Sequence, residues 1–311
     1  MKSKLEKVVI TGGTGFVGSH LVKYLCQSNC EVIVITRSNE KLRDDMVGRI
    51  RYIPRKDLLK SKIDNIDICI HLAAYGVDSK KNDFNELVNA NIIFVKEVID
   101  FCVLNNVAKL INTGSCFEYG NIGIKRANEK TEIKPESLYG ATKAAGVIIA
   151  NTYAKMRGIP LITIRPFGIY GEGEAENRLV PQLMKAFFTN TKLNLTGGEQ
   201  IRDYLYIDDV ISAIIELATN GVPLYQTYNI CSAKEISIRE FVEYMIKIAG
   251  ASKELFQFGA LPYRKNELMY YVGDNSLIRK YTNWLPKVTF EEGFEKILLW
   301  YKEKNIGVSV K

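Results

Sequence analysis

Tyr139 and Lys143 stand four residues apart in the stretch YGATKAAG, inside a segment whose pattern is typical of a helix. Four residues are about one helical turn, so both side chains are expected on one face. A tyrosine hydroxyl has an ordinary pKa of about 10, which is too high for proton exchange near neutral pH. A lysine cation one turn away would favour tyrosinate and lower that pKa. Because the spacing is also common on ordinary helices, it indicates acid–base chemistry only beside a matching cofactor or substrate site.

A second chemical signature is the stretch ITGGTGFVGSHL, in which Gly12, Gly15 and Gly18 recur every three residues between an apolar run and an amphipathic one. In such a strand–turn–helix the backbone approaches a pyrophosphate and the helix N-terminus faces the anion. No Lys-Ser/Thr pair follows, so the turn is not a P-loop. The stretch predicts a dinucleotide site formed by Gly12, Thr14, Gly15, Phe16, Val17 and Gly18.

The end of the second predicted strand indicates which dinucleotide binds. An NAD site usually has an acidic residue about 20 positions after the glycines, where it binds the ribose 2′-hydroxyl. Here Arg37 and Ser38 stand instead, and an arginine can hold a 2′-phosphate through two hydrogen bonds. We therefore predict NADPH (NADP), with NAD as the alternative if Arg37 is only a surface residue. Asp57, after the third predicted strand, is placed either to contact the adenine or to cap a helix.

The elements that must position these residues are short apolar runs alternating with longer amphipathic ones. Strands are predicted at residues 7–13, 31–37, 51–54, 66–74, 108–115 and 161–171, and helices at 16–26, 85–105 and 137–157. This alternation is typical of an α/β fold with a doubly wound parallel sheet.

The pattern becomes less regular after about residue 170, which indicates a second, smaller lobe. We expect an NADP-binding Rossmann-type domain at 1–170 with a return segment near 203–231, and a C-terminal lobe that is mainly substrate-binding at 171–311. The absence of a Gly/Ser linker predicts that the lobes pack together around a cleft.

Composition excludes several classes of protein. The 311 residues carry a net charge of +7, but Lys and Arg are scattered, so no nucleic acid is implied. No apolar run reaches the ~18 residues of a membrane span, and no signal-peptide pattern is present, so a cytoplasmic protein is expected. The six cysteines form no CxxC pair and there are two histidines, which indicates reduced core thiols and no metal site.

With the glycine turn and the Tyr139–Lys143 pair in one chain, the sequence resembles the extended short-chain dehydrogenase/reductase (NAD-dependent epimerase/dehydratase) family. The resemblance covers nearly the whole chain, through the stretches HLAA (71–74), NANI (89–92), TGSCFEYG (113–120), RPFGIYG (165–171) and RDYLYIDDV (202–210). It implies a Rossmann-type domain with a small C-terminal substrate lobe, and most extended members act on nucleotide sugars.

The resemblance also implies a catalytic triad. Ser115 matches the residue that hydrogen-bonds the reacting oxygen, Tyr139 the acid/base, and Lys143 the partner of that tyrosine, which can also hold the nicotinamide ribose. Further cofactor contacts are implied at Leu72, Ala73, Ala74, Asn91 and Pro166.

Two features narrow the activity within this resemblance. Nucleotide-sugar 4,6-dehydratases carry an Asp-Glu pair after the Ser/Thr, whereas this chain has Cys116 and Phe117, so dehydration is not expected. The segments 171–183, 196–210 and 256–270 are similar to nucleotide-sugar 4-ketoreductases that make 6-deoxyhexoses. Substrate contacts are thereby implied at Ser115, Cys116, Asn177, Val180, Arg202, Arg264 and Glu267, with the two arginines on the pyrophosphate.

The expected activity is NADPH-dependent reduction of the C4 ketone of a nucleotide-diphospho-4-keto-6-deoxyhexose, giving a 6-deoxyhexose donor for a surface polysaccharide. A 4-epimerase that retains NAD is the first alternative, and a non-catalytic dinucleotide-binding sensor or scaffold is the second. The nucleotide and the C4 configuration stay open. The resemblance further implies a homodimer that pairs through the helices at 85–105 and 137–157.

Overall fold

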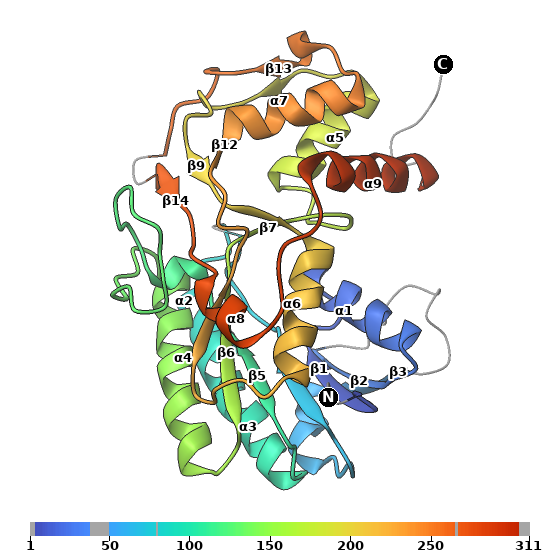
Figure 1. Ribbon diagram of the computed structural model, residues 1–311, viewed down its shortest axis with the longest axis vertical. Helices are drawn as coiled ribbons and strands as arrows, with labels where there is room; N and C mark the ends of the chain where they lie inside the picture. The colour runs from blue at the N-terminus through green and yellow to red at the C-terminus, as the bar shows by residue number, and fades with distance from the viewer. Residues whose placement is uncertain (1–3, 38–49, 79, 265–266, 305–311) are drawn as a thin grey trace.

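A computed structural model describes residues 4–37, 50–78, 80–264 and 267–304 (Figure 1). In this part of the chain seven parallel strands form the central sheet, in the order β11-β6-β5-β4-β1-β2-β3. The chain runs outward from β1 to β3, returns to place β4 beside β1, and then runs outward to β11. The order therefore reverses between β1 and β4, and ligands of doubly wound sheets bind at the carboxyl ends of the strands at such a point.

Most strands of this sheet are short runs buried on both faces, as parallel strands require, whereas the edge strand β3 is only partly buried. The strands of the sheet are β1 (Lys7–Thr11), β2 (Glu31–Thr36), β3 (Ile50–Pro54), β4 (Ile68–His71), β5 (Leu110–Thr113), β6 (Leu161–Pro166) and β11 (Thr227–Ile230). The predicted α/β class and doubly wound parallel sheet are confirmed.

Helices cover both faces of the sheet (Figure 1). On one face lie α1 (Phe16–Gln27) and α6 (Ile207–Thr219), and on the other α3 (Phe94–Leu104) and α4 (Leu138–Met156). Val8 packs in the cluster that includes α1, and its neighbour Val9 packs in the cluster that includes α3, because side chains alternate along a strand. No helix in the described ranges is long and apolar enough to cross a bilayer.

The helix predicted at 85–105 is divided in the structure. It comprises α2 (Phe84–Val88), a π-helical turn over Asn89–Ile93, and α3. The turn lies against α4 so closely that a Cβ on Gly146 would be 2.1 Å from the carbonyl oxygen of Asn91. A π-helical turn often marks a functional site, and this one faces the helix that carries Tyr139.

The remaining elements form a smaller lobe beyond the carboxyl ends of the sheet, at the top of Figure 1. Its helices are α5 (Leu179–Thr189), α7 (Ile238–Ala249) and α9 (Phe290–Glu303), and α8 (Ser276–Tyr281) returns toward β11. Its short strands pair as β8 (Leu193–Asn194) with β13 (Phe256–Gln257), and as β9 (Ile201–Arg202) with β12 (Ile236–Ser237) and β14 (Tyr270–Tyr271). One hydrophobic cluster continues from α1 and α6 into α5, α7 and α9, so the lobe is packed on the sheet domain.

The strand predicted at 161–171 is interrupted at Phe167. Beyond that residue β7 (Gly168–Tyr170) leaves the central sheet and pairs with β10 (Tyr204–Tyr206). A Cβ on Gly168 would lie 2.6 Å from the carbonyl oxygen of Asp203, so the close approach of these two segments depends on glycine.

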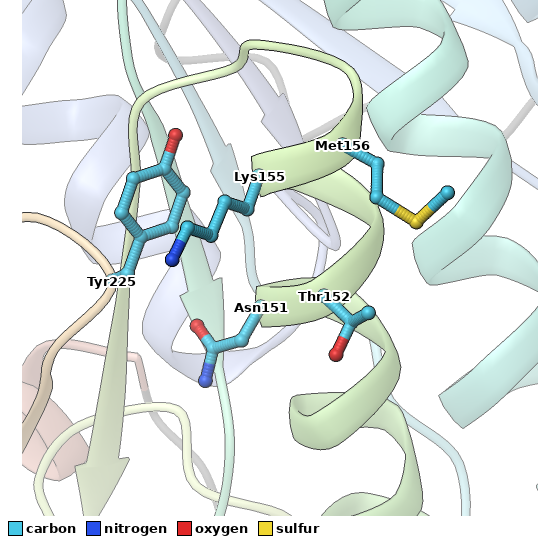
Figure 2. A pocket seen from close by; sticks show the side chains of 5 residues that line it. All are labelled: Asn151, Thr152, Lys155, Met156 and Tyr225. Carbon is cyan, nitrogen blue, oxygen red and sulfur yellow. The ribbon is translucent and has the colours of Figure 1, made fainter.

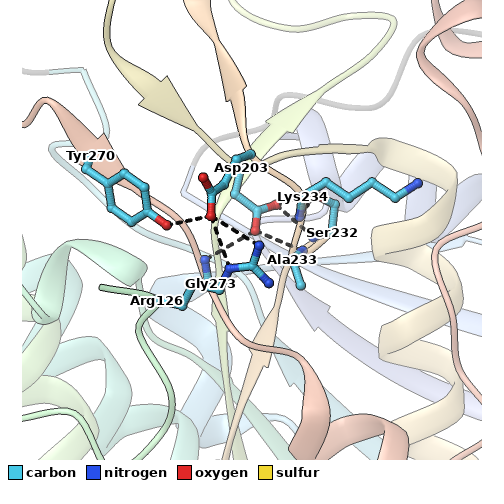
Figure 3. A network of polar contacts seen from close by, with 8 residues as sticks. Arg126, Asp203, Ser232, Ala233, Lys234, Tyr270 and Gly273 are labelled. Atoms are coloured by element: carbon cyan, nitrogen blue, oxygen red, sulfur yellow. Dashed lines mark hydrogen bonds and ion pairs between the residues drawn. The ribbon is translucent and has the colours of Figure 1, made fainter. Parts of the chain in front are cut away.

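Asp203, between β9 and β10, joins three segments that are distant in sequence (Figure 3). Its buried carboxylate accepts hydrogen bonds of 2.7–3.2 Å from the hydroxyl and backbone N–H of Ser232 and from the backbone N–H groups of Ala233 and Gly273. Burial raises the pKa of Asp203, and these four hydrogen bonds oppose that rise. The cluster fixes the base of the lobe and, with it, the neighbouring Arg202.

Candidate active site

The glycine turn lies at the carboxyl end of β1, where the strand order reverses. Gly12 has a φ of +70°, and a Cβ there would lie 2.7 Å from the backbone nitrogen of Ala73. Gly15 is the N-cap of α1, and no side chain caps this helix end. The N–H groups of the first turn are thus left for an external acceptor, and a phosphate suits them. The residues present fit a dinucleotide.

Replacing Gly18 by Ala is expected to destabilise the protein by about 1–3 kcal/mol and to weaken dinucleotide binding. The added Cβ would lie 2.1 Å from the carbonyl oxygen of Gly12, so the turn would have to open. Urea unfolding and nicotinamide fluorescence titration measure the two effects. The matched control is Gly221→Ala, where a Cβ meets no atom within 4 Å. If Gly18→Ala were as stable as Gly221→Ala, the close approach of the glycine turn to α1 at Gly18 would be contradicted.

The other residues predicted to contact the cofactor follow the neighbouring strands. Arg37 is exposed immediately after β2, and Ser38 lies outside the described residues. Leu72, Ala73 and Ala74 directly follow β4, and Pro166 ends β6. They therefore share the carboxyl edge of the sheet with the glycine turn.

Asp57 and Asn91 occupy settings that the sequence did not reveal. Asp57 is half-buried in a short 3₁₀ helix (Arg55–Lys60) whose N-cap is Pro54, so it is not the cap of that helix. The Asn91 side chain bonds both backbone groups of Tyr75, at 3.1 and 3.0 Å, and the Thr142 hydroxyl at 3.0 Å. This side chain holds the loop after β4 against α4, and the cofactor contact of Asn91 stays a prediction.

The structure brings together Ser115, Tyr139 and Lys143. Ser115 follows β5, and the other two residues lie on successive turns at the start of α4. The Ser137 side chain caps α4 by accepting the N–H of Gly140 at 3.0 Å, which fixes where the helix begins. The Ser115 side chain lies close enough to the Tyr139 phenol to lower its pKa.

The Tyr139 phenol is held in its protonated form. Burial raises its pKa to about 12, although the nearby Ser115 side chain opposes the rise. The ammonium group of the buried Lys143 donates a hydrogen bond to the carbonyl oxygen of Thr113. The pKa of Tyr139 in this structure is raised and not lowered as predicted, because burial penalises tyrosinate more than Ser115 and Arg178 favour it, and Lys143 is not among the groups that shift it.

Lys143 is expected to set the alkaline limit of turnover. Burial lowers its pKa to about 8, so its cation is present below that pH and is lost above it. The pKa values of Tyr139 and His71, about 12 and about 3, lie outside the range from pH 6 to 9. We expect kcat/KM for the sugar, measured with saturating reduced cofactor, to fall above about pH 8. In Lys143→Arg this fall should move beyond pH 10, because arginine keeps its proton.

The lowered pKa of Lys143 also predicts how stability depends on pH. As pH rises above about 8, stability should increase while activity falls. The folded-state pKa of Lys143 lies below its ordinary value of 10.5, so the unfolded chain binds more protons between about pH 8 and 10.5. The contribution of Lys143 to the free energy of unfolding therefore rises with pH in this window. An alkaline limit of activity near pH 8 without loss of folded protein would separate the catalytic effect from unfolding.

Ser115 is oriented by a buried ion pair that the sequence reading did not assign. Glu118 accepts the N–H of Ser115 at 2.6 Å, and Ser115 accepts the N–H of Phe117 at 3.3 Å. Glu118 is 0% exposed and pairs with two guanidinium nitrogens of Arg165, each at 2.7 Å. The Ser-x-x-Glu spacing of a capping box was the available signal.

His71 ends β4 as a neutral side chain. Burial lowers its pKa to about 3, and its Nδ1 shares a 2.7 Å hydrogen bond with the Thr11 hydroxyl. Its ring packs edge-on against Phe94. These contacts indicate that His71 has a structural role.

The residues predicted to hold the substrate lie mostly along the lobe. Arg202 and Glu267 form an ion pair of 2.7 Å, each with a side chain that is 20% exposed. The backbone of Glu267 also bonds the carbonyl oxygen of the exposed Arg264, at 3.1 Å. The structure therefore brings these three residues together, although 62 positions separate Arg202 from Arg264 in the sequence.

Asn177 and Val180 have different surroundings. The Asn177 amide donates to Asp78, at 2.8 Å, and so links the start of the lobe to the loop after β4. Val180 is 2% exposed within the hydrophobic core, and its substrate contact stays a prediction. Cys116 is also buried, and burial raises its thiol pKa to about 12, so it is a neutral group.

A second acidic group near the site is Glu174, in the loop after β7. Its side chain is 8% exposed and forms a 3.3 Å ion pair with Arg178. Burial raises the pKa of Glu174 to about 7, and Arg178 opposes that rise. The charge of Arg178 also favours ionisation of Tyr139, so this arginine lies near the catalytic hydroxyl.

A separate pocket of about 440 Å³ lies at the far end of α4, lined by Asn151, Thr152, Lys155, Met156 and Tyr225 (Figure 2). At 1.5 Å per residue, Asn151 lies roughly 18 Å along the helix from Tyr139. The pocket is therefore not part of the catalytic site.

Comparison with known proteins agrees with this geometry. A sequence model of the NAD dependent epimerase/dehydratase family matches residues 8–231. CDP-abequose synthase of Salmonella typhimurium is 28% identical, over 94% of this chain and 97% of that protein. The dTDP-D-glucose 4,6-dehydratase of Dictyostelium discoideum is 27% identical, over 97% of this chain and 82% of that protein.

A solved structure shows the same likeness. The UDP-glucuronic acid 4-epimerase of Bacillus cereus, in complex with UDP-glucuronic acid and NAD, superposes with a TM-score of 0.84 at 26% identity. The match covers 96% of this chain and 99% of that one. Proteins similar to this chain thus include a synthase, a dehydratase and an epimerase.

Proposed function

Because the chain belongs to the NAD-dependent epimerase/dehydratase family, we propose that it is a nucleotide-sugar 4-ketoreductase. Its substrate is a nucleotide-diphospho-4-keto-6-deoxyhexose, and its product is a nucleotide-activated 6-deoxyhexose for a surface polysaccharide. The similarity to CDP-abequose synthase supports this choice.

The observation that carries the proposal is a protonated Tyr139 next to Ser115 at the carboxyl edge of the sheet. Reduction of a ketone needs a proton donor at the developing alkoxide, and a phenol with a pKa of about 12 is in the donating form. Ser115 hydrogen-bonds the same oxygen. Lys143, cationic below about pH 8, stabilises the tyrosinate that remains. A bound reduced nicotinamide supplies the hydride.

The side chains after Ser115 support reduction over dehydration. A 4,6-dehydratase must remove and add protons at C5 and C6 of the sugar, which requires ionisable groups there. Cys116 is a buried neutral thiol, and Phe117 has no acid–base chemistry. These two side chains therefore do not supply that acid–base chemistry, although the chain as a whole is similar to a dehydratase.

We propose NADPH as the reductant. Arg37 is exposed at the carboxyl end of β2, where a cation can bind a 2′-phosphate and an acid would repel it. The similar Bacillus cereus epimerase is described with NAD, so the two cofactors must be compared directly. The ratio of kcat/KM for NADPH and NADH makes that comparison.

Arg202 and Arg264 are proposed to bind the diphosphate, and Glu267 the nucleotide ribose. In the structure Arg202 is paired with Glu267 at 2.7 Å, so its guanidinium is already ordered beside the carboxylate. Asn177, bonded to Asp78, is proposed to bind the diphosphate with the two arginines.

A 4-epimerase is the second candidate, because a solved epimerase shares the fold over nearly the full chain. Product analysis with NADPH deuterated at the transferred position distinguishes the two. A reductase places one deuterium at C4 of the product. Interconversion of two hexose nucleotides, with no deuterium incorporated, would establish an epimerase that recycles its own hydride.

We also propose a homodimer that pairs through the helices at 85–105 and 137–157. Large apolar side chains are exposed on these segments, including Ile93 (45%), Ile148 (63%) and Met156 (77%). Exposed apolar surface of this kind is typical of an interface. The mass in solution, from light scattering, tests this proposal.

A further inference from the structure

Phe117 is a large aromatic side chain that stays exposed beside the catalytic tyrosine. Its ring is 45% exposed, and its centroid lies 6.0 Å from that of Tyr139, with the planes at 72°. Its neighbour Cys116 is only 4% exposed. An exposed apolar ring beside the proposed reaction centre is available to contact a bound substrate, since ligand sites are lined mainly by apolar and aromatic side chains.

The ring is held in place from several sides. It stacks on Tyr271 at 5.5 Å, with the planes at 29°. The Tyr271 hydroxyl in turn donates to the backbone carbonyl of Cys116. A Cβ on Gly140 would lie 2.4 Å from the carbonyl oxygen of Phe117, so the first turn of α4 fits directly against this residue. The Phe117 ring is therefore positioned by Tyr139 and Tyr271, and its backbone is positioned by the start of α4.

The position of the Phe117 ring relative to Tyr139 indicates which part of a sugar the ring contacts. The proposed reaction places the C4 oxygen at the hydroxyls of Tyr139 and Ser115. C5 and its substituent C6 are within two bonds of C4, and C6 is a methyl group in a 6-deoxyhexose. A methyl group is the apolar end of such a sugar, and an aromatic face is a suitable surface to bury it.

We propose that Phe117 is a specificity-determining residue that selects nucleotide sugars with a methyl group at C6 over those with a hydroxymethyl group. The inference rests on the proposed function for the orientation of the sugar. It goes beyond that function by assigning the C6 selection to one side chain. A 6-hydroxyl facing the Phe117 ring would lose hydrogen bonds to water without finding a partner.

Binding calorimetry with pairs of nucleotide sugars that differ only at C6 tests the proposal without turnover. Each pair consists of a nucleotide 6-deoxyglucose and the matching nucleotide glucose, taken in turn as CDP, dTDP, UDP and GDP compounds. The wild-type protein should bind the 6-deoxy member about tenfold more tightly, as expected for one small group in an apolar pocket. In Phe117→Ala this ratio should fall to near one, and in Phe117→Leu most of it should remain.

Two controls identify the cause of a change. Leu285→Ala removes an apolar side chain of similar exposure (47%) and should leave the ratio unchanged. Affinity for the free nucleoside diphosphate, which does not reach Phe117, should be the same in all variants and reports correct folding.

The outcomes separate this inference from the proposed function. Equal binding of both members by the wild-type protein, or an unchanged ratio in Phe117→Ala, overturns the role of Phe117 alone. A tenfold preference in a protein that never reduces a 4-keto sugar overturns the proposed reaction and leaves the C6 selection in place. No binding to any pair overturns both.

Discussion

Replacing Tyr139 by Phe is expected to lower kcat for ketone reduction by about 10²–10⁴-fold, the usual contribution of a positioned proton donor. The variant keeps the ring that packs edge-on against Phe117 and removes only the hydroxyl. Affinity for the dinucleotide should be unchanged, because the glycine turn lies on a different element. Stopped-flow absorbance of the nicotinamide and a fluorescence titration measure the two quantities.

Tyr153→Phe is the matched control for this experiment. Tyr153 lies on the same helix, and its hydroxyl donates to Asp100 at 2.6 Å, away from Ser115. Its loss removes two hydrogen bonds, the one to Asp100 and one accepted from Arg157 at 2.8 Å, each worth about 1 kcal/mol of stability, and should leave kcat unchanged. If Tyr139→Phe retained activity within tenfold of the wild type, Tyr139 would not be the proton donor.

Glu118→Ala is expected to lower the free energy of unfolding by about 3–5 kcal/mol, because it leaves the buried Arg165 without its partner. The same change removes the acceptor for the N–H of Ser115, so residual folded protein should also turn over slowly. Urea unfolding followed by circular dichroism gives the stability.

The exposed pair Glu132–Lys134 provides the control for the buried one. Its side chains are 72% and 66% exposed, so Glu132→Ala should cost no more than about 1 kcal/mol. Equal effects of the two substitutions would show that Glu118 does not hold the turn that carries Ser115.

Short-range patterns predicted most of the sheet domain. Runs of Val and Ile marked β1 and β2, and glycine spacing marked the turn into α1, because these features are encoded within a few adjacent residues. The π-helical turn at Asn89–Ile93 was not predictable in this way. It depends on the packing of α4 at Gly146, which is more than 50 positions away.

The candidate site residues also divide into features that adjacent residues encode and features that depend on the whole fold. The spacing of Tyr139 and Lys143 was visible in the sequence, but the pKa of Tyr139 was not, because burial depends on the whole fold. Val180 matched a substrate position by sequence, yet it faces the core because of how α5 packs. Glu118 and Arg165 lay inside stretches that carried the resemblance, and only their contact revealed their joint role.

Reduction of a 4-keto sugar by Tyr139 and its partners is tested most directly by nicotinamide absorbance. The purified protein and NADPH are mixed in turn with each of a set of 4-keto-6-deoxyhexose nucleotides generated by a dehydratase, and the absorbance is followed. We predict stoichiometric loss of NADPH with one nucleotide, which would also identify the base. No loss of NADPH with any of them, together with interconversion of an ordinary hexose nucleotide without added cofactor, would contradict the reductase and establish the epimerase.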